Sequence, residues 1–175
     1  MIRSISPADN LAVANIIRTV MPEFGAGGQG FAIHDPEVND MFGAYTRPRC
    51  AYFVCELNGK VVGGGGVAPL EGGDTDTCEL KKMYFLPEAR GRGLGGEILK
   101  ACLDAAAELG FKYCYLETFN TMTAAMRVYE HYGFQKIPGP LGNTGHFACD
   151  TFYKRELSSP KRNPPTIRSR EFPGD

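Results

Sequence analysis

The chain of 175 residues has no tryptophan, three histidines and no C-x-x-C pair. Without clustered cysteines or histidines at ligand spacing, we expect no metal site. Near the N-terminus no apolar run is long enough for a secretory signal or a membrane span, and Asp9 argues against a transit peptide. We therefore expect a cytoplasmic protein. Its six cysteines are expected to be reduced and mostly buried as small apolar residues: Cys50, Cys55, Cys78, Cys102, Cys114 and Cys149.

An excess of either charge is also missing. The chain has 19 Lys and Arg against 20 Asp and Glu, a formal net charge of −1. Because a nucleic-acid site needs a clustered basic surface, we expect neither a nucleic-acid nor a membrane partner, and leave a homodimer open. The length fits one core, so residues 1–157 are predicted to form a single domain. Residues 158–175 combine prolines and charges without an apolar face, which predicts a disordered or surface-laid tail.

The first half alternates between helical and strand patterns. Ser6-Pro7 predicts a helix start, and Pro22 predicts its end. A short helix is expected after Asp35-Pro36. Residues 51–57 and 60–70 flank Asn58-Gly59, which predicts a β-hairpin. The apolar stripe of the first helix is expected to contain Leu11, Ala14, Ile17 and Val20.

Four consecutive glycines, Gly63 to Gly66, interrupt the second hairpin strand. Glycine weakens a strand interior, so a bulge is favoured there over the close approach of a ligand. The following residues, 71–77, are predicted to form an exposed acidic loop.

The second half predicts one βαβ crossover. A strand over residues 78–86, a helix over 93–110 and a strand over 112–119 require a parallel strand pair inside an otherwise antiparallel sheet. A helix over 121–132 follows, with Gly133 as its left-handed cap. Two more strands are expected, within residues 134–137 and 147–157. These elements place the chain in the α/β (α+β) class.

The turn between the crossover strand and its helix reads RGRGLGG. Backbone N–H groups at a helix start attract anions, and glycines let a phosphate lie against the backbone. Three glycines also cost helix propensity, which favours a binding role. The sequence therefore predicts a pyrophosphate site made by Arg90, Gly91, Arg92, Gly93, Leu94, Gly95 and Gly96.

Two kinds of phosphate binder compete for this loop. Gly91, Gly93 and Gly96 satisfy G-x-G-x-x-G, and Glu117 ends the next strand, as in a dinucleotide fold. That fold needs the motif early in a series of βαβ units, whereas here a hairpin-rich half precedes it. No G-K-[ST] follows, so the loop is not a P-loop. The arginines instead give R-x-x-G-x-G after Leu86-Pro87.

With LKKMYFLPEARGRGLG, YCYLETF and AAMRVYEHYGF in this order, the chain resembles the GNAT superfamily of acyl-CoA-dependent N-acetyltransferases over about residues 1–157. The resemblance implies helices on both faces of a mixed, mostly antiparallel sheet whose parallel strands splay around acetyl-CoA. It implies that the strand at Tyr84, Phe85 and Leu86 binds the pantetheine arm and stabilises the oxyanion. Many relatives carry asparagine where this chain has Met122, so Asn120 or Thr121 is expected to contact acetyl-CoA instead.

The resemblance also implies the catalytic groups. Tyr129, four residues before Gly133, would protonate the leaving thiolate and contact acetyl-CoA, and Tyr132 is the second choice. Glu79 would accept the proton of the amine. Strand alternation places Glu79 and Lys81 on one face, so that they could pair, and Lys82 on the other. His146, in the loop before the last strand, is the alternative base.

These features predict the transfer of an acetyl group to a primary amine through a tetrahedral intermediate. A small metabolite such as an amino acid is the first expectation for the acceptor, and a peptide or protein amine is the second. Two other classes stay open: a non-catalytic acyl-CoA sensor and, more distantly, a dinucleotide-binding oxidoreductase.

Overall fold

A seven-stranded sheet organises residues 1–158, the part of the chain that the computed structural model describes. Its strands are β1 (Ile2–Ser4), β2 (Ala51–Leu57), β3 (Lys60–Pro69), β4 (Thr77–Phe85), β5 (Tyr113–Thr118), β6 (Gln135–Ile137) and β7 (Thr151–Glu156). Their order is β1-β2-β3-β4-β5-β7-β6, and only the β4–β5 pair is parallel. The predicted mixed sheet is thereby confirmed. Apart from Ser158, the predicted tail lies outside the described residues.

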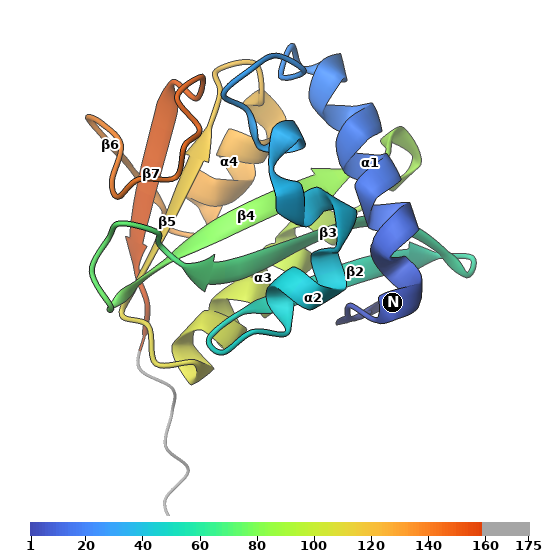
Figure 1. Ribbon diagram of the computed structural model, residues 1–175, viewed down its shortest axis with the longest axis horizontal. Coiled ribbons are helices and arrows are strands. Elements are labelled where there is room, and N and C mark those ends of the chain that lie inside the picture. Colours follow the sequence, from blue (N-terminus) through green and yellow to red (C-terminus); the bar gives the residue numbers. More distant parts are fainter. Residues whose placement is uncertain (159–175) are drawn as a thin grey trace, which may run out of the picture.

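Helices cover both faces of the sheet (Figure 1). On one face lie α1 (Asn10–Glu23) and α2 (Met41–Tyr45), and on the other lie α3 (Leu94–Glu108) and α4 (Thr123–His131). No helix among the described residues is long and apolar enough to cross a membrane. Short 3-10 turns complete the fold: η1 (Pro7–Asp9), η2 (Ala32–His34), η3 (Pro36–Asn39) and η4 (Pro87–Ala89).

Each face of the sheet has its own hydrophobic core. The core under α3 includes the fully buried Ile98, Leu99 and Tyr153, while the core under α1 includes Ile17 and Met41. All six cysteines are unbridged, as expected, and four of them are buried. Because burial of apolar side chains supplies most of the folding free energy, these two cores hold β4 and β5 in place from both sides.

Most predicted elements form, with shifted ends. Asn58 and Gly59 both have positive φ, at 51° and 76°, which confirms the hairpin turn. Gly133, at φ 85°, is the predicted left-handed cap. Two details of the first helix were wrong: it continues past Pro22 to Glu23, and Leu11 is 72% exposed. The short strand β1 was not predicted.

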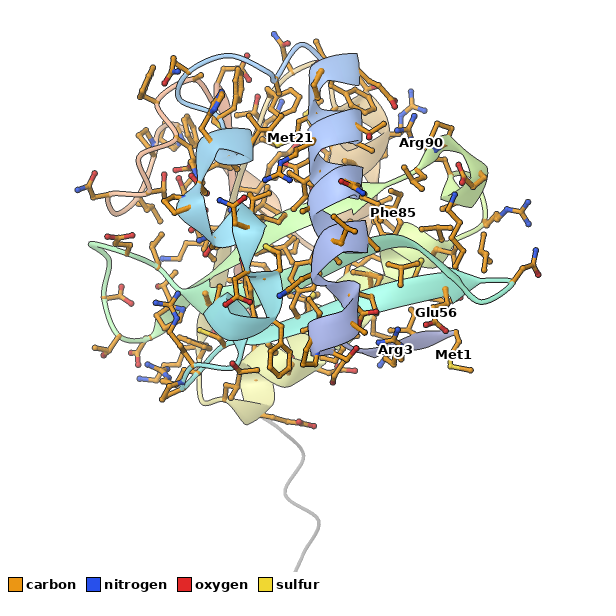
Figure 2. All side chains as sticks on the ribbon, turned by 45° about the vertical axis from the view of Figure 1, so that its right-hand side comes forward. Met1, Arg3, Met21, Glu56, Phe85 and Arg90 are labelled. Carbon is orange, nitrogen blue, oxygen red and sulfur yellow. The ribbon has the colours of Figure 1, made fainter. Side chains whose placement is uncertain are left out.

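At the N-terminus, Arg3 ties β1 to the start of the first helix. Its guanidinium contacts Asp9 at 2.7 Å and Glu56 at 2.6 Å (Figure 2). The hydrogen bonds from Arg3 lower the pKa of Asp9 to about 2, although burial acts in the opposite direction. The terminal ammonium of Met1 also donates to the Glu56 carbonyl, at 3.0 Å. This network is distant from β5 and serves the fold.

The four glycines of β3 make room for aromatic rings. A Cβ atom on Gly63 would collide with the Phe85 ring, and one on Gly66 would lie 2.5 Å from the Tyr52 ring. The predicted irregularity is present, since the register with β4 shifts between Gly64 and Gly66. The extra residue of this bulge, however, belongs to β4. The glycines therefore allow two rings to pack flat against the sheet.

Candidate functional site

The two parallel strands pair only briefly and then diverge. β4 contacts β5 from Thr77 to Glu79, opposite Tyr113 to Tyr115. Beyond Glu79 and Tyr115, β4 continues to Phe85 and β5 continues to Thr118, but the two strands no longer pair with each other. The predicted splay is therefore present and begins at Glu79. Two adjoining cavities open along it, and they share Met83, Tyr84 and Met122.

The outer cavity is an apolar cleft of about 320 Å³ between the glycine-rich loop, α1 and α4. Its α4 wall is formed by Ala124, Ala125 and Val128. Most of the predicted acetyl-CoA contacts meet here: Tyr84, Phe85, Arg90, Gly91, Gly93, Leu94, Gly95 and Gly96.

The loop before α3 has the backbone geometry of an anion site. Gly91 and Gly93 have φ of 71° and 79°, which disfavours any side chain. The first hydrogen bond of the helix runs from the Glu97 N–H to the Gly93 carbonyl, at 3.2 Å. The N–H groups of the preceding residues therefore point out beyond the helix start, as is usual for a first turn. A Cβ atom on Gly91 or Gly93 would meet no other atom within 4 Å, so the space beside the loop is open.

Four predicted contacts lie outside this cleft, and one of them, Tyr129, lines the inner cavity instead. The Leu86 N–H donates to the Val62 carbonyl at 2.8 Å, so it is engaged within the sheet. Arg92 is exposed and donates to the Glu88 carbonyl at 2.8 Å. Asn120 is exposed, with its N–H on Asp150 at 2.9 Å. Arg90 lines the cleft but already bonds Glu23 at 2.8 Å (Figure 2).

The register of β3 and β4 selects Phe85 as the backbone donor facing the splay. Residues of an antiparallel pair bond their partner strand alternately. Leu86 and Val62 form a hydrogen-bonded pair, so the next pair along the two strands, Phe85 and Gly63, is a non-bonded pair. The N–H and C=O groups of Phe85 therefore point away from Gly63. The Phe85 carbonyl accepts from the Arg90 side chain at 3.0 Å. The Phe85 N–H therefore points toward the gap between β4 and β5.

A bulge in β4 changes which lysines reach the site. Lys82 has φ 53° and is the extra residue of the bulge. The prediction that Lys82 lies opposite Lys81 was wrong, because the bulge interrupts the alternation. Lys81 and Lys82 both contact Glu37, at 3.0 and 2.6 Å. The expected partner of Lys81, Glu79, makes no ion pair among the described residues.

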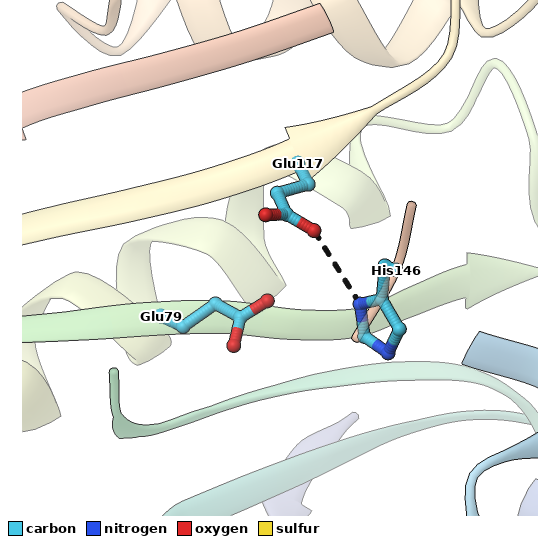
Figure 3. Close-up of side chains that lie close together, drawn as sticks. All are labelled: Glu79, Glu117 and His146. Atoms are coloured by element: carbon cyan, nitrogen blue, oxygen red, sulfur yellow. Dashed lines mark ion pairs between the residues drawn. The ribbon is translucent and has the colours of Figure 1, made fainter. Parts of the chain in front are cut away.

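Charged side chains line the inner cavity, and Figure 3 shows three of them, Glu79, Glu117 and His146, close together. The His146 Nε2 is 2.8 Å from Asp35, and its Nδ1 is 3.5 Å from Glu117. Asp35 also accepts from Lys82 at 2.6 Å. Asp35 and Glu37 were not predicted as site residues, since their only signal was the Asp-Pro pair at the start of a short helix.

Glu117 accepts hydrogen bonds from two hydroxyl groups. The Tyr115 hydroxyl donates to it at 2.7 Å and the Thr144 hydroxyl at 2.8 Å. Its pKa is lowered, because hydrogen bonds from His146 and these hydroxyls outweigh burial. Its position at the end of β5 fits this cluster and not a dinucleotide fold, whose further βαβ units are absent from residues 1–158.

Glu79 is the exception among these acids. Burial raises its pKa to about 7, and the nearby Lys81 and His146 only partly oppose that effect. The neighbouring Asp35 behaves differently: burial raises its pKa, but His146 and Lys82 outweigh burial and bring it to about 2. Burial also opposes protonation of His146, yet bonds to Asp35 and Glu117 raise its pKa to about 9. At neutral pH, His146 is therefore protonated and Glu79 is half-ionised.

Tyr129 lines the inner cavity together with Glu79 and His146. Its ring packs edge-on against Phe134, with centroids 6.0 Å apart. No hydrogen bond of its hydroxyl is found among the described residues, and burial raises its pKa. Tyr132, the second choice, lies outside both cavities, with its hydroxyl beside Gly96. The structure therefore brings the first choice, and not the second, into the same cavity as Glu79.

Known proteins share this fold. A solved acetyltransferase of the GNAT family from Staphylococcus aureus Mu50 superposes with a TM-score of 0.80 at 20% identity, over 90% of this chain and 99% of that chain. The yncA acetyltransferase of Salmonella typhimurium, solved with its cofactor acetyl-CoA, gives 0.71 at 21% identity, over 94% and 98%. These likenesses support the fold.

Sequence similarity extends beyond the fold. The protein named Uncharacterized N-acetyltransferase YjgM of Escherichia coli (strain K12) is 44% identical over 158 residues, which is 90% of this chain and 95% of that protein. A family model described as Acetyltransferase (GNAT) family matches residues 14–134. The chain therefore belongs to the GNAT family of acetyltransferases.

Proposed function

We propose that this protein transfers the acetyl group of acetyl-CoA, the acyl donor of its family, to the primary amine of a small molecule. One observation carries the proposal. The splay between β4 and β5 joins an anion-binding loop at its outer end to Glu79 and Tyr129 at its inner end. An acyl-CoA needs both ends, since its pyrophosphate and its thioester lie far apart in the molecule.

The cleft residues divide the binding of the donor among them. The N–H groups of Gly93 to Gly96 and the side chain of Arg90 would hold the pyrophosphate. The apolar α4 wall would pack against the pantetheine arm, and the Phe85 N–H would bond it or the acetyl oxygen. The open space beside Gly91 and Gly93 supports the approach of a phosphate to this loop.

In the reaction, the amine nitrogen attacks the thioester carbon, and the carbon–sulfur bond breaks as the thiolate leaves. Glu79 takes the proton that the ammonium loses, and a pKa of about 7 suits this role near neutral pH. Tyr129 donates a proton or hydrogen bond to the thiolate. His146 is protonated over the same pH range, which supports Glu79 over His146 as the base.

The test is a calorimetric titration of the purified protein with acetyl-CoA, CoA and NADH, followed by a panel of amines monitored for CoA release. Micromolar binding of acetyl-CoA with CoA release on a small amine is the expected result. Binding without release on small amines, but with release on peptides, would indicate a protein acceptor. Binding with no release at all would indicate a sensor, and binding of NADH alone would overturn the proposal.

A further inference from the structure

Glu79 is a buried acid without a partner. Its exposed fraction is 4%, yet its carboxylate makes no hydrogen bond or ion pair within residues 1–158. Every fully enclosed polar side-chain atom in residues 1–158 has a hydrogen-bond partner. Because the Glu79 oxygens have none, they are not fully enclosed and must face the inner cavity that Glu79 lines. In its ionised form, a carboxylate buried in this position calls for a positively charged ligand.

The charges around the inner cavity point to the same missing cation. Four carboxylates, of Asp35, Glu37, Glu79 and Glu117, face three cationic groups, of Lys81, Lys82 and His146. The cations are all engaged: Lys82 bonds Asp35 and Glu37, Lys81 bonds Glu37, and His146 lies between Asp35 and Glu117. When Glu79 is ionised, the cluster therefore carries one unbalanced negative charge, and Glu79 is the acid left without a partner.

The spacing suits an ammonium group. Glu79, Glu117 and His146 each place a ligand atom within 4.8 Å of the other two (Figure 3). A nitrogen that donates to two oxygens at about 2.8 Å, at a tetrahedral angle, holds those oxygens about 4.6 Å apart. One ammonium can thus bridge Glu79 and Glu117. The remaining wall of the cavity is apolar and includes Met21, Phe31, Ala32, Phe119 and Met122.

We propose that Glu79 and Glu117 together bind the ammonium group of the acceptor, and that the acceptor is a primary amine on a hydrocarbon chain with no carboxylate beside the amine. This inference rests on the proposed function and narrows its acceptor. An α-amino acid would bring its carboxylate against Glu79 and Glu117. It would find no unpaired cation among the described residues of the cavity, and like charges in contact are strongly unfavourable.

Matched pairs of amines that differ by one carboxylate test the proposal. The full-length protein, loaded with CoA, is titrated calorimetrically with phenethylamine and phenylalanine, and then with tyramine and tyrosine. With acetyl-CoA, CoA release is measured for the same four compounds. We expect the carboxylate-free member of each pair to bind and react at least 100-fold better. Equal or better binding of the amino acids, or binding of none of the four, would overturn the proposal.

A variant tests whether Glu117 contributes to this preference. Glu117→Gln removes one negative charge, so the preference for phenethylamine over phenylalanine should fall at least tenfold. Glu108→Gln is the matched control, because Glu108 is exposed near the end of α3. An unchanged preference in Glu117→Gln would exclude Glu117 from the site. The wild-type pairs test the proposal even if this variant folds poorly.

The two proposals fail in distinguishable ways. Loss of acetyl-CoA binding would contradict the proposed function, whereas retained binding of acetyl-CoA with a preference for amino acids would contradict only the acceptor class. The same three ligand atoms are also spaced for a divalent cation. Activity that is lost with EDTA and restored by Zn²⁺ would show that a metal takes the place assigned to the ammonium.

Discussion

At the scale of single residues, aromatic packing holds Tyr129 at the wall of the inner cavity, where the proposed reaction would use it as a donor to the leaving thiolate. Its ring lies between Phe134 and Tyr153, with centroids 6.0 and 6.1 Å away, and its hydroxyl has no protein partner among the described residues. Tyr129→Phe should therefore lower kcat by about 10- to 100-fold and leave the Kd for acetyl-CoA nearly unchanged. Steady-state kinetics and calorimetry measure the two effects.

The control for this prediction is Tyr132→Phe, one turn along the same chain segment. Tyr132 lies outside the inner cavity, so its kcat should stay near the wild-type value. If the Tyr132 variant loses more activity than the Tyr129 variant, the assigned proton donor is wrong.

The raised pKa of Glu79 predicts the pH dependence of both activity and stability. Its carboxyl must be ionised to accept a proton, so kcat/KM should rise with pH through about 7. The same raised pKa makes the ionised form unfavourable in the folded protein. Between pH 4.5 and 7 the folded state binds more protons than the unfolded state, so this group lowers the free energy of unfolding as pH rises.

The variant Glu79→Gln checks both consequences. We expect loss of most activity together with a gain in unfolding free energy at pH 8, on the order of 2–3 kcal/mol, and a much smaller gain at pH 4.5. Urea denaturation at the two pH values measures this difference. An equal gain at both pH values would show that Glu79 is not buried as an acid.

At the scale of elements, the glycines before and at the start of α3 differ in what a side chain would disturb. Gly91 and Gly93 have positive φ, so a side chain at either would strain the backbone as well as block a ligand. Gly95 has no such strain, and a Cβ atom there would lie 3.8 Å from Phe85, an ordinary contact. Gly95 is therefore the position at which binding can be separated from folding.

Gly95→Val should weaken acetyl-CoA binding at least tenfold without lowering the midpoint of thermal unfolding, because its methyl groups enter the cleft that Gly95 lines. Gly139→Val is the control, since a Cβ atom there meets nothing within 4 Å and the residue lies outside both cavities. Unchanged acetyl-CoA affinity in Gly95→Val would remove this end of the loop from the binding site.

The local sequence pattern was enough to predict most helices and strands, but it did not predict the bulge of β4 at Lys82. Strand period, Asn58-Gly59 and Gly133 each have a local cause, so the hairpin, the crossover and the last helix cap were predicted. The bulge at Lys82 arises from the partner strand, where Gly65 faces the extra residue. Asp35 and Glu37 join the site through Lys82, which the bulge brings to both of them, and through His146 and Lys81. Contacts between segments this far apart leave no periodic signal in the sequence.

At the scale of the whole molecule, the inner cavity is closed by two segments from opposite ends of the chain. Asp35 precedes η3, and His146 lies in the loop between β6 and β7. Their contact, at 2.8 Å, joins residues that are 111 positions apart. Lys82 of the central strand bonds the same Asp35 oxygen, so the pair is anchored to the sheet. One ion-paired cluster therefore joins the two segments at the inner cavity to the sheet.

This arrangement predicts how stability responds to alkaline pH. The pKa of His146 is raised from 6.5 to about 9, so its charge stabilises the folded state fully below pH 6.5, and the contribution is lost as pH rises through about 9. The His146→Gln variant should be less stable than wild type by about 1–2 kcal/mol at pH 7.5, after allowance for partial solvent screening, and by much less at pH 9.5. With a pKa of about 7, Glu79 is mostly ionised by pH 7.5, and Asp35 and Glu117 stay ionised, so the difference reports mainly on His146. Urea denaturation of both proteins at the two pH values measures it, and a stability deficit that does not shrink with pH would show that His146 acts through packing alone.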